Sequence, residues 1–124
     1  MRRVTITLIL LLCLLAVPAA AQARYTVGFS EQQSAMFSDP LFKALGTRQA
    51  RLIVSYDAVL KNTFEVADID RWIAGARANG VRPLVSFNYS RGCFADGKIP
   101  RRPACRLPSV ATFTRAFRAF RARY

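Results

Sequence analysis

Two cysteines and the basic residues around them are the part of the sequence whose types and spacing most directly suggest chemistry. Cys93 and Cys105 are the cysteines that follow the apolar N-terminal run, and an even pair in an exported chain predicts a disulfide. On the chain-entropy model such a bridge contributes on the order of 3 kcal/mol. Free or intermolecular thiols are the alternative. Five cations flank the pair: Arg91, Lys98, Arg101, Arg102 and Arg106.

These cations suit an anionic partner such as an acidic polysaccharide, a wall polymer or phospholipid headgroups. A solvated charged loop would have the same composition. Nucleic acid is a weaker candidate, because no nucleic-acid-binding module is recognisable and the remaining arginines are scattered along the chain.

The overall composition excludes several classes of site. The 124 residues include no histidine, which removes Ser-His and Cys-His nucleophilic pairs and histidine metal ligands. We therefore expect neither a metal nor a cofactor. The formal charge is +12, from 19 Lys+Arg against 7 Asp+Glu. With 52% hydrophobic and 11% aromatic residues, the chain has enough apolar surface for a folded core, and its length allows one small domain.

Residues 1–23 are predicted to be a secretory signal peptide. A short basic start precedes the apolar run Val4–Val17, and small residues then lead to a cleavage site after Ala23. The run is shorter than the roughly 20 residues that span a bilayer, which disfavours an uncleaved membrane anchor. We expect a secreted or extracytoplasmic domain, 24–124, with no transmembrane segment after cleavage.

The first part of this domain has the pattern of a strand followed by a short helix. Tyr25–Phe29 is prone to form a strand, and the polar segment 31–38 is expected to be irregular or a single turn. Asp39 and Pro40 are an N-cap and first-turn pair, and Gly46 suits the left-handed position that ends a helix.

Two further strands enclose a longer helix. Arg51–Tyr56 is a nearly continuous apolar run of the kind found in buried parallel sheets, and its arginine would need a carboxylate or a position at the strand entrance. A loop to Asn62 precedes a helix over 66–79, whose apolar stripe places Trp72 in the core. Val81–Phe87 is the third strand.

The sequence closes with a long loop and an amphipathic helix. The loop 88–108 holds both cysteines, and Ser109 caps a helix that runs to Tyr124. The resulting β-α-β-α-β-α order predicts an α/β fold with a parallel sheet and right-handed crossovers. An open doubly wound sheet and a (β/α)8 barrel share this order. Because a barrel needs about 250 residues, the chain would contain its first three units.

Several stretches together carry a family resemblance. They are residues 25–30, 36–42 with 45–46, 50–57, 83–88 and 105–110. In these stretches the chain resembles the N-terminal part of secreted bacterial glycoside hydrolase-like barrels. The resemblance implies a (β/α)8 fold and a retaining mechanism, in which the acid/base glutamate follows an asparagine at the end of strand 4 and the nucleophilic glutamate ends strand 7.

The resemblance also implies where glycans would bind. Residues at the carboxyl ends of the strands shape the family's sugar-binding cleft, so the candidate substrate-binding residues are Tyr56, Asp57, Phe87 and Asn88. Asp57 could instead cap its loop, Asn88 could serve turn formation, and the two aromatic residues could be core. Neither catalytic glutamate has a counterpart here, since retaining chemistry needs two carboxyl groups about 5–5.5 Å apart and none of the seven acids matches those roles.

Two functions from different classes follow. The first is the N-terminal part of a secreted glycoside hydrolase-like protein that acts on or binds carbohydrate, inactive by itself and prone to associate through its sheet edges. The alternative is a small cationic exported protein that is stapled by a disulfide and binds anionic cell-envelope polymers.

Overall fold

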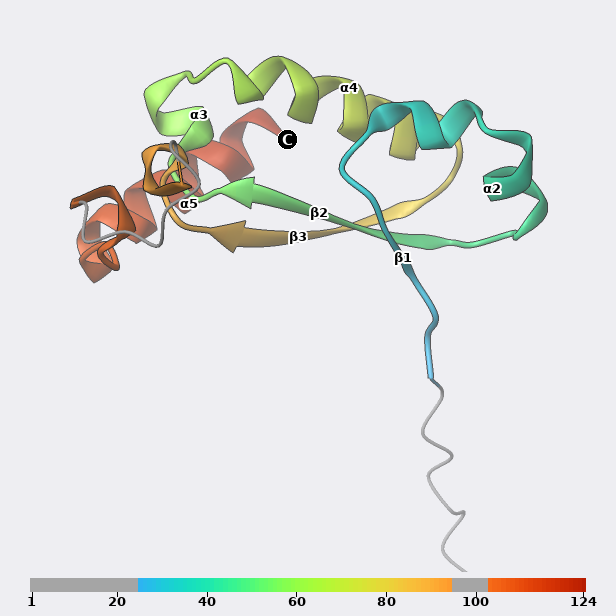
Figure 1. Cartoon of the computed structure of the whole chain (residues 1–124), viewed down its shortest axis with the longest axis horizontal. Helices are drawn as coiled ribbons and strands as arrows, with labels where there is room; N and C mark the ends of the chain where they lie inside the picture. Colours follow the sequence, from blue (N-terminus) through green and yellow to red (C-terminus); the bar gives the residue numbers. More distant parts are fainter. Residues whose placement is uncertain (1–24, 95–102) are drawn as a thin grey trace, which may run out of the picture.

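The computed structural model describes residues 25–94 and 103–124. Its three parallel strands form one sheet in the order β1-β2-β3, which confirms the mixed α/β class (Figure 1). The elements in chain order are β1 (Phe29–Ser30), η1 (Ser34–Ser38), α2 (Pro40–Ala44), β2 (Gln49–Ser55), α3 (Ala58–Lys61), α4 (Glu65–Ala78), β3 (Arg82–Asn88), η2 (Arg91–Phe94), η3 (Pro103–Cys105) and α5 (Val110–Arg123). The predicted signal peptide, 1–23, lies outside the described residues.

The two strand pairings differ greatly in length. β2 and β3 pair along their whole lengths, from Gln49 opposite Arg82 to Ser55 opposite Asn88. β1 pairs with β2 at only two positions. The expected first strand, Tyr25–Phe29, is therefore wrong in its bounds, because pairing with β2 begins only at Phe29 and Tyr25 is 93% exposed.

Side chains replace the missing part of β1. Beyond its end, the Ile53 amide donates to Oε1 of Gln32 at 2.9 Å. The Ser55 amide donates to Oε1 of Glu65 at 3.1 Å. These two acceptors satisfy the β2 amides that a longer β1 would have bonded.

The helix α4 covers one face of the sheet with the predicted apolar stripe. Trp72 is fully buried, as expected, and its indole Nε1–H donates to the Glu31 carbonyl at 2.9 Å. The Phe37 ring packs edge-on against it, 5.1 Å between centroids. A Cβ on Gly75 would come within 2.6 Å of that ring, so a glycine is required for η1 to approach α4 this closely.

Two helices begin at the predicted side-chain caps, whereas α3 and α4 have no side-chain cap hydrogen bond. Asp39 accepts the Leu41 amide at 2.7 Å at the start of α2, and Ser109 accepts the Thr112 amide at 3.2 Å at the start of α5. The segment expected to be a loop before Asn62 instead contains the single turn α3. Asn62 ends that turn in the left-handed conformation, with φ of 49°.

The opposite face of the sheet is open (Figure 1). Arg51 belongs to this face and is exposed, and the ion pair with a carboxylate, one of the two alternatives considered for it, is absent from the described structure. Its Nε donates to the Ser30 hydroxyl at 3.2 Å. Ile53 and Leu84, at 38% and 60% exposure, lie on the same open face.

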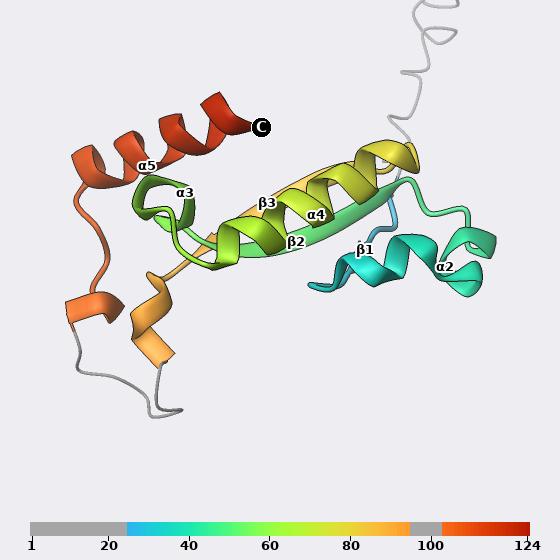
Figure 2. The same ribbon diagram turned by 90° about the horizontal axis from the view of Figure 1, so that it is seen from above.

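The helix α5 lies on the β3 side of the sheet, whereas η1 and α2 lie on the β1 side (Figure 2). It packs on the same face as α4, because Phe120 joins the core cluster that contains Trp72. Arg123 holds α5 to α4 by donating to both carboxylate oxygens of Asp70, at 2.9 and 2.6 Å, and the Tyr124 hydroxyl donates to Oδ1 at 2.7 Å. Within the described ranges, no helix is long and apolar enough to span a bilayer.

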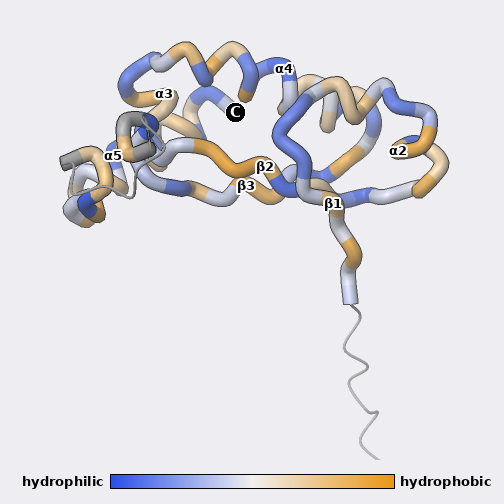
Figure 3. Tube along the Cα trace, in the orientation of Figure 1, coloured by the Kyte–Doolittle hydropathy of each residue, from blue (hydrophilic) through white to orange (hydrophobic). Residues whose placement is uncertain are grey.

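Hydropathy follows this one-sided arrangement. Figure 3 shows the most apolar stretch of backbone in the middle of β2. Its alternate residues Ala50, Leu52 and Val54 are buried under the helices. The core therefore lies between the sheet and a single layer of helices.

Candidate functional site

A cleft of about 1080 Å³ lies at the carboxyl ends of the strands. The segment after β1 forms one wall, the start of α4 forms another, and the residues after β3 close the end. Most of its lining is polar or aromatic, and the groups used below are Gln32, Phe64, Glu65, Asn88, Tyr89 and Arg91.

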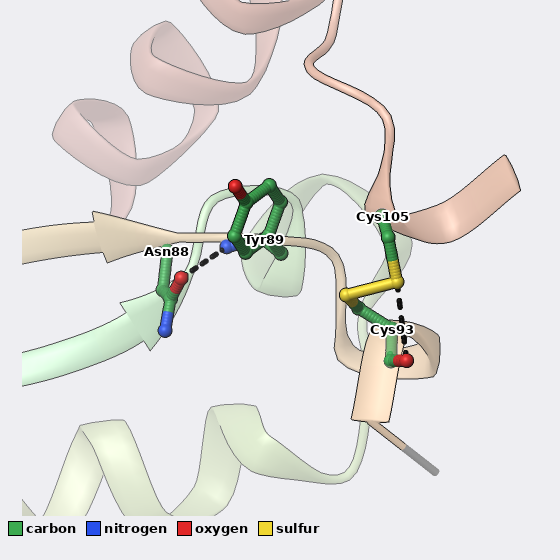
Figure 4. Close-up of a disulfide and its surroundings, with 4 residues drawn as sticks. All are labelled: Asn88, Tyr89, Cys93 and Cys105. Atoms are coloured by element: carbon green, nitrogen blue, oxygen red, sulfur yellow. Dashed lines mark hydrogen bonds between the residues drawn. A yellow bond between two sulfur atoms is a disulfide. The ribbon is translucent and has the colours of Figure 1, made fainter. Parts of the chain in front are cut away.

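Asn88 is the predicted site residue that this cleft contains. It is the last residue of β3 and is exposed. Its Oδ1 accepts the amide of Tyr89 at 2.8 Å (Figure 4). The side chain therefore makes the turn contact considered in the sequence interpretation. The side-chain nitrogen of Asn88, Nδ2, has no hydrogen bond within the described part of the chain.

Asp57 lies beneath the surface and does not line the cleft. It is 1% exposed, its Oδ2 is 2.6 Å from the Lys61 ammonium, and the same oxygen accepts the Ser90 hydroxyl at 2.8 Å. The hydrogen bond to Asp57 raises the pKa of Lys61. Although Asp57 occupies the N-cap position of α3, its side chain makes no cap hydrogen bond. The contacts connect the loops after β2 and β3 and thereby support the cleft from below.

Glu65 is a cleft residue that sequence reasoning missed. One carboxylate oxygen accepts the Ser55 amide, while Oε2 is buried without a hydrogen-bond partner in the described structure. Its position in the first turn of α4 suggests only a favourable contact with the helix dipole. No local signal reveals that β1 is too short to satisfy the Ser55 amide.

An exposed aromatic ring and a guanidinium form the outer wall of the cleft. The Arg91 guanidinium lies 4.7 Å from the centroid of the Phe64 ring, which is 71% exposed. Nearby Arg71 pairs with Asp68. Exposed rings and hydrogen-bonding side chains in one cleft are the groups that recognise a polyhydroxylated ligand.

Tyr56 and Phe87 line a second, more apolar groove of about 530 Å³, together with Asn88. The Phe87 ring packs edge-on against Phe113 at 6.0 Å and against Phe120 at 5.1 Å. Tyr56 is 6.2 Å from Phe113. The start of α5 thus packs against both predicted aromatic residues, which stay half-buried; Phe87 packs against the core cluster, whereas Tyr56 is not part of it.

The predicted disulfide is present between Cys93 and Cys105, with the Cα atoms 4.7 Å apart (Figure 4). It joins η2, which follows β3, to η3, which precedes α5. Of the predicted basic cluster, Arg91 and Arg106 are exposed, whereas Lys98, Arg101 and Arg102 lie outside the described residues. The described ranges contain no group of three or more acidic or cysteine side chains placed to hold a metal ion.

Comparison with known proteins gives no relative for this chain: no family model, no curated protein and no solved structure matches it.

Proposed function

We propose that this chain forms the first three strand–helix units of a (β/α)8 barrel and that its cleft binds glycans in a secreted glycoside hydrolase-like protein. The position of α5 is the observation that supports this architecture. The strands follow one another across the sheet in chain order, and α5 packs on the same face as α4. Because crossovers keep one hand, a strand after α5 would continue beyond β3, as in a barrel. A doubly wound sheet would place that helix on the opposite face.

The cleft supports a glycan as the ligand. It lies at the carboxyl ends of parallel strands, where barrel enzymes build their active sites. Asn88, Gln32 and Arg91 offer amide and guanidinium donors, and Phe64 offers an exposed ring face. Since the family's acid/base and nucleophilic glutamates follow strands 4 and 7, these residues would bind sugar rather than cleave it.

An anionic cell-envelope polymer is the second candidate ligand. It is supported by the exposed arginines of α5, a helix that contains no acidic residue. Arg115, Arg118 and Arg121 form no ion pair in the described structure, whereas Arg123 is paired with Asp70. Retention by such a surface would be screened by salt, because the Debye length is about 8 Å at physiological ionic strength.

A binding experiment separates the two ligands. The full chain, exported to an oxidising periplasm, is passed over insoluble neutral polysaccharides and over an anionic polymer across a salt series. We expect salt-independent retention on a neutral glycan. Asn88→Ala should weaken it about three- to tenfold, as expected for lost hydrogen bonds. Gln49→Ala, at the amino end of β2 and away from the cleft, should leave retention unchanged. Retention only on the anionic polymer, abolished by salt, would support the second candidate and reject the glycan.

The architecture has a separate test in the gene. The nucleotides that follow the Tyr124 codon should encode an apolar strand that ends in Asn-Glu, with a second glutamate roughly a hundred residues later, if the barrel proposal is correct. A stop codon at that position would reject it.

A further inference from the structure

Charged side chains line the cleft at the carboxyl ends of the strands, and they differ in what already satisfies them. Asp68 pairs with Arg71. One oxygen of Glu65 accepts the Ser55 amide, and the other is buried. Arg91 is exposed and has no ion pair within the described residues. The accessible charge that the cleft offers to a ligand is therefore a single guanidinium.

The Phe64 ring holds this guanidinium without neutralising it. The Arg91 guanidinium lies over the ring, 4.7 Å from its centroid. An aromatic ring attracts a cation through its quadrupole but carries no formal charge. A guanidinium has five N–H donors in a planar fork that matches the two oxygens of a carboxylate. Arg91 thus keeps the charge and the donors that a ligand carboxylate requires.

The backbone on both sides of Arg91 is anchored. The Ser90 hydroxyl donates to the buried carboxylate of Asp57 at 2.8 Å, and the Cys93 amide donates to the Ser90 carbonyl at 3.0 Å. Cys93 is buried and bonded to Cys105 (Figure 4). A binding group that is held in place before the ligand arrives loses less freedom on binding. This anchoring favours Arg91 as a recognition residue over a freely moving surface arginine.

Asn88 adds a contact of a different kind to the same cleft. Its Nδ2 donor has no hydrogen bond within the described part of the chain. An amide donor suits a sugar hydroxyl oxygen, whereas the guanidinium suits a carboxylate. Because the unpaired carboxylate of Glu65 also lies at this cleft, a ligand with one negative charge per recognised sugar suits it better than a dianion. A sugar that carries both hydroxyl groups and one carboxylate is a uronic acid.

We propose that the cleft binds a glycan that contains a uronic acid, whose carboxylate pairs with Arg91 and whose hydroxyl groups bond Asn88. The inference rests on the proposed glycan-binding function and names the chemical class of the glycan. The hydroxyl contacts supply the salt-independent part of the retention, and the carboxylate adds to it. The arginines of α5, which support the second candidate ligand, take no part.

Titration with fluorescently labelled oligomers tests the carboxylate. The full chain, exported to an oxidising periplasm, is titrated with oligomers of galacturonic, glucuronic and mannuronic acid and with the methyl ester of each, which keeps the sugar ring and removes the charge. At least one acid should bind about tenfold more tightly than its ester, as expected for a charge-assisted contact. Equal binding of every acid and its ester would overturn the proposal and leave the glycan cleft in place. Binding of no oligomer would reject both.

Arginine variants locate the contact. Arg91→Ala should remove the preference for the acid, about tenfold, and leave binding of the ester within about twofold. Arg91→Lys keeps the charge but loses the planar fork, so about a threefold loss should remain. Arg82→Ala is the matched control, because Arg82 is exposed without an ion pair in the described structure and lies at the opposite end of β3 from the cleft. Equal losses for the two alanine variants would reject Arg91 as the partner of the carboxylate.

Asn88→Ala separates this inference from the proposed function. It should weaken binding of the acid and of the ester by the same factor, because the hydroxyl contacts are common to both. If Asn88→Ala weakens both ligands and Arg91→Ala weakens neither, the cleft binds glycan but the uronic acid assignment is wrong.

Discussion

The two sides of the sheet differ in how the backbone amides without a neighbouring strand are satisfied. On the β1 side, strand pairing stops after two residues, and Gln32 and Glu65 supply side-chain oxygens to the β2 amides that remain. On the β3 side, Val85 and Phe87 present amides that nothing in the described structure accepts. For Ser55 the reason is cost, since its amide is nearly buried and a buried amide without an acceptor costs about 1–3 kcal/mol, whereas an exposed amide can bond water.

The helix layer repeats this contrast. Over the β1 side, Trp72 and Phe37 are almost fully buried. Over the β3 side, Phe113 and Phe117 keep more than a third of their surface exposed. We call the part of the helix layer around Trp72 and Phe37 the finished side, and the part around Phe113 and Phe117 the unfinished side. The finished side holds the buried core, and the unfinished side has apolar surface that a further strand would cover. The four predictions below test this difference.

Removing the Trp72 side chain should have the largest effect. Trp72→Ala empties the centre of the finished side and leaves the Glu31 carbonyl without its indole donor. We expect a loss of about 3–5 kcal/mol in the free energy of unfolding, measured by urea titration. Phe117→Ala on the unfinished side should cost only roughly 1 kcal/mol. Similar losses for the two variants would remove the contrast between the sides.

The disulfide should contribute the next largest effect. Cys93→Ser with Cys105→Ser frees the loop between β3 and α5, and the chain-entropy model predicts a loss of about 3 kcal/mol. Thermal unfolding of the oxidised protein and of the variant measures the difference. A reducing agent should lower the midpoint of the parent chain and leave that of the variant unchanged. An unchanged midpoint in the parent would show that the bridge does not constrain the unfolded chain.

The side-chain cap at Glu65 should give an intermediate effect. Glu65→Ala leaves the nearly buried Ser55 amide without an acceptor, at a cost of about 1–3 kcal/mol, whereas Glu65→Gln keeps an oxygen at that position. Hydrogen exchange at Ser55 should accelerate in the alanine variant alone. Asp68→Ala, in the same first turn but exposed, is the control. Equal exchange at Ser55 in the alanine and glutamine variants would contradict the capping role.

The sequence predicts what depends on local pattern. The stripe that buries Trp72, the Asp39 and Ser109 caps and the pairing of the two cysteines all follow from spacing and residue type, and all are present. The role of Glu65 could not be predicted in the same way. It depends on where β1, which ends 35 residues earlier at Ser30, stops pairing, and no pattern within α4 records that position.

The same distinction applies to the candidate site residues, because local pattern predicts some of their positions and not others. The position of Asn88 in the cleft could be predicted, because the apolar pattern shows where β3 ends. Asp57 follows the end of β2, as predicted, but its side chain is buried in contact with Lys61 and Ser90 and does not line the cleft. Phe87 alternates onto the helix side, where α5 covers it. The sequence predicts where each strand ends. Whether a side chain at that end lines the cleft or is covered depends on the elements that pack against it.

The contact that holds α5 to α4 should give the smallest effect, visible as a pH dependence. Hydrogen bonds from Arg123, and then from Tyr124, lower the pKa of Asp70 to about 2. A carboxyl group with a lowered pKa in the folded state stabilises that state above its unfolded pKa of about 4. The contribution is lost as the pH falls from about 4 through 2.

Thermal midpoints measured from pH 5 to pH 2 test this contact. The parent chain should lose stability over that range, and Asp70→Asn should remove part of the slope. Asp68→Asn is the matched control, because Asp68 also pairs with an arginine but connects two turns of the same helix. Parallel profiles for the Asp70 variant and the parent would show that α5 is held on the unfinished side by its aromatic contacts alone. Because Phe120 is buried in the core cluster, α5 should stay packed in the Asp70 variant, and only the pH slope should change.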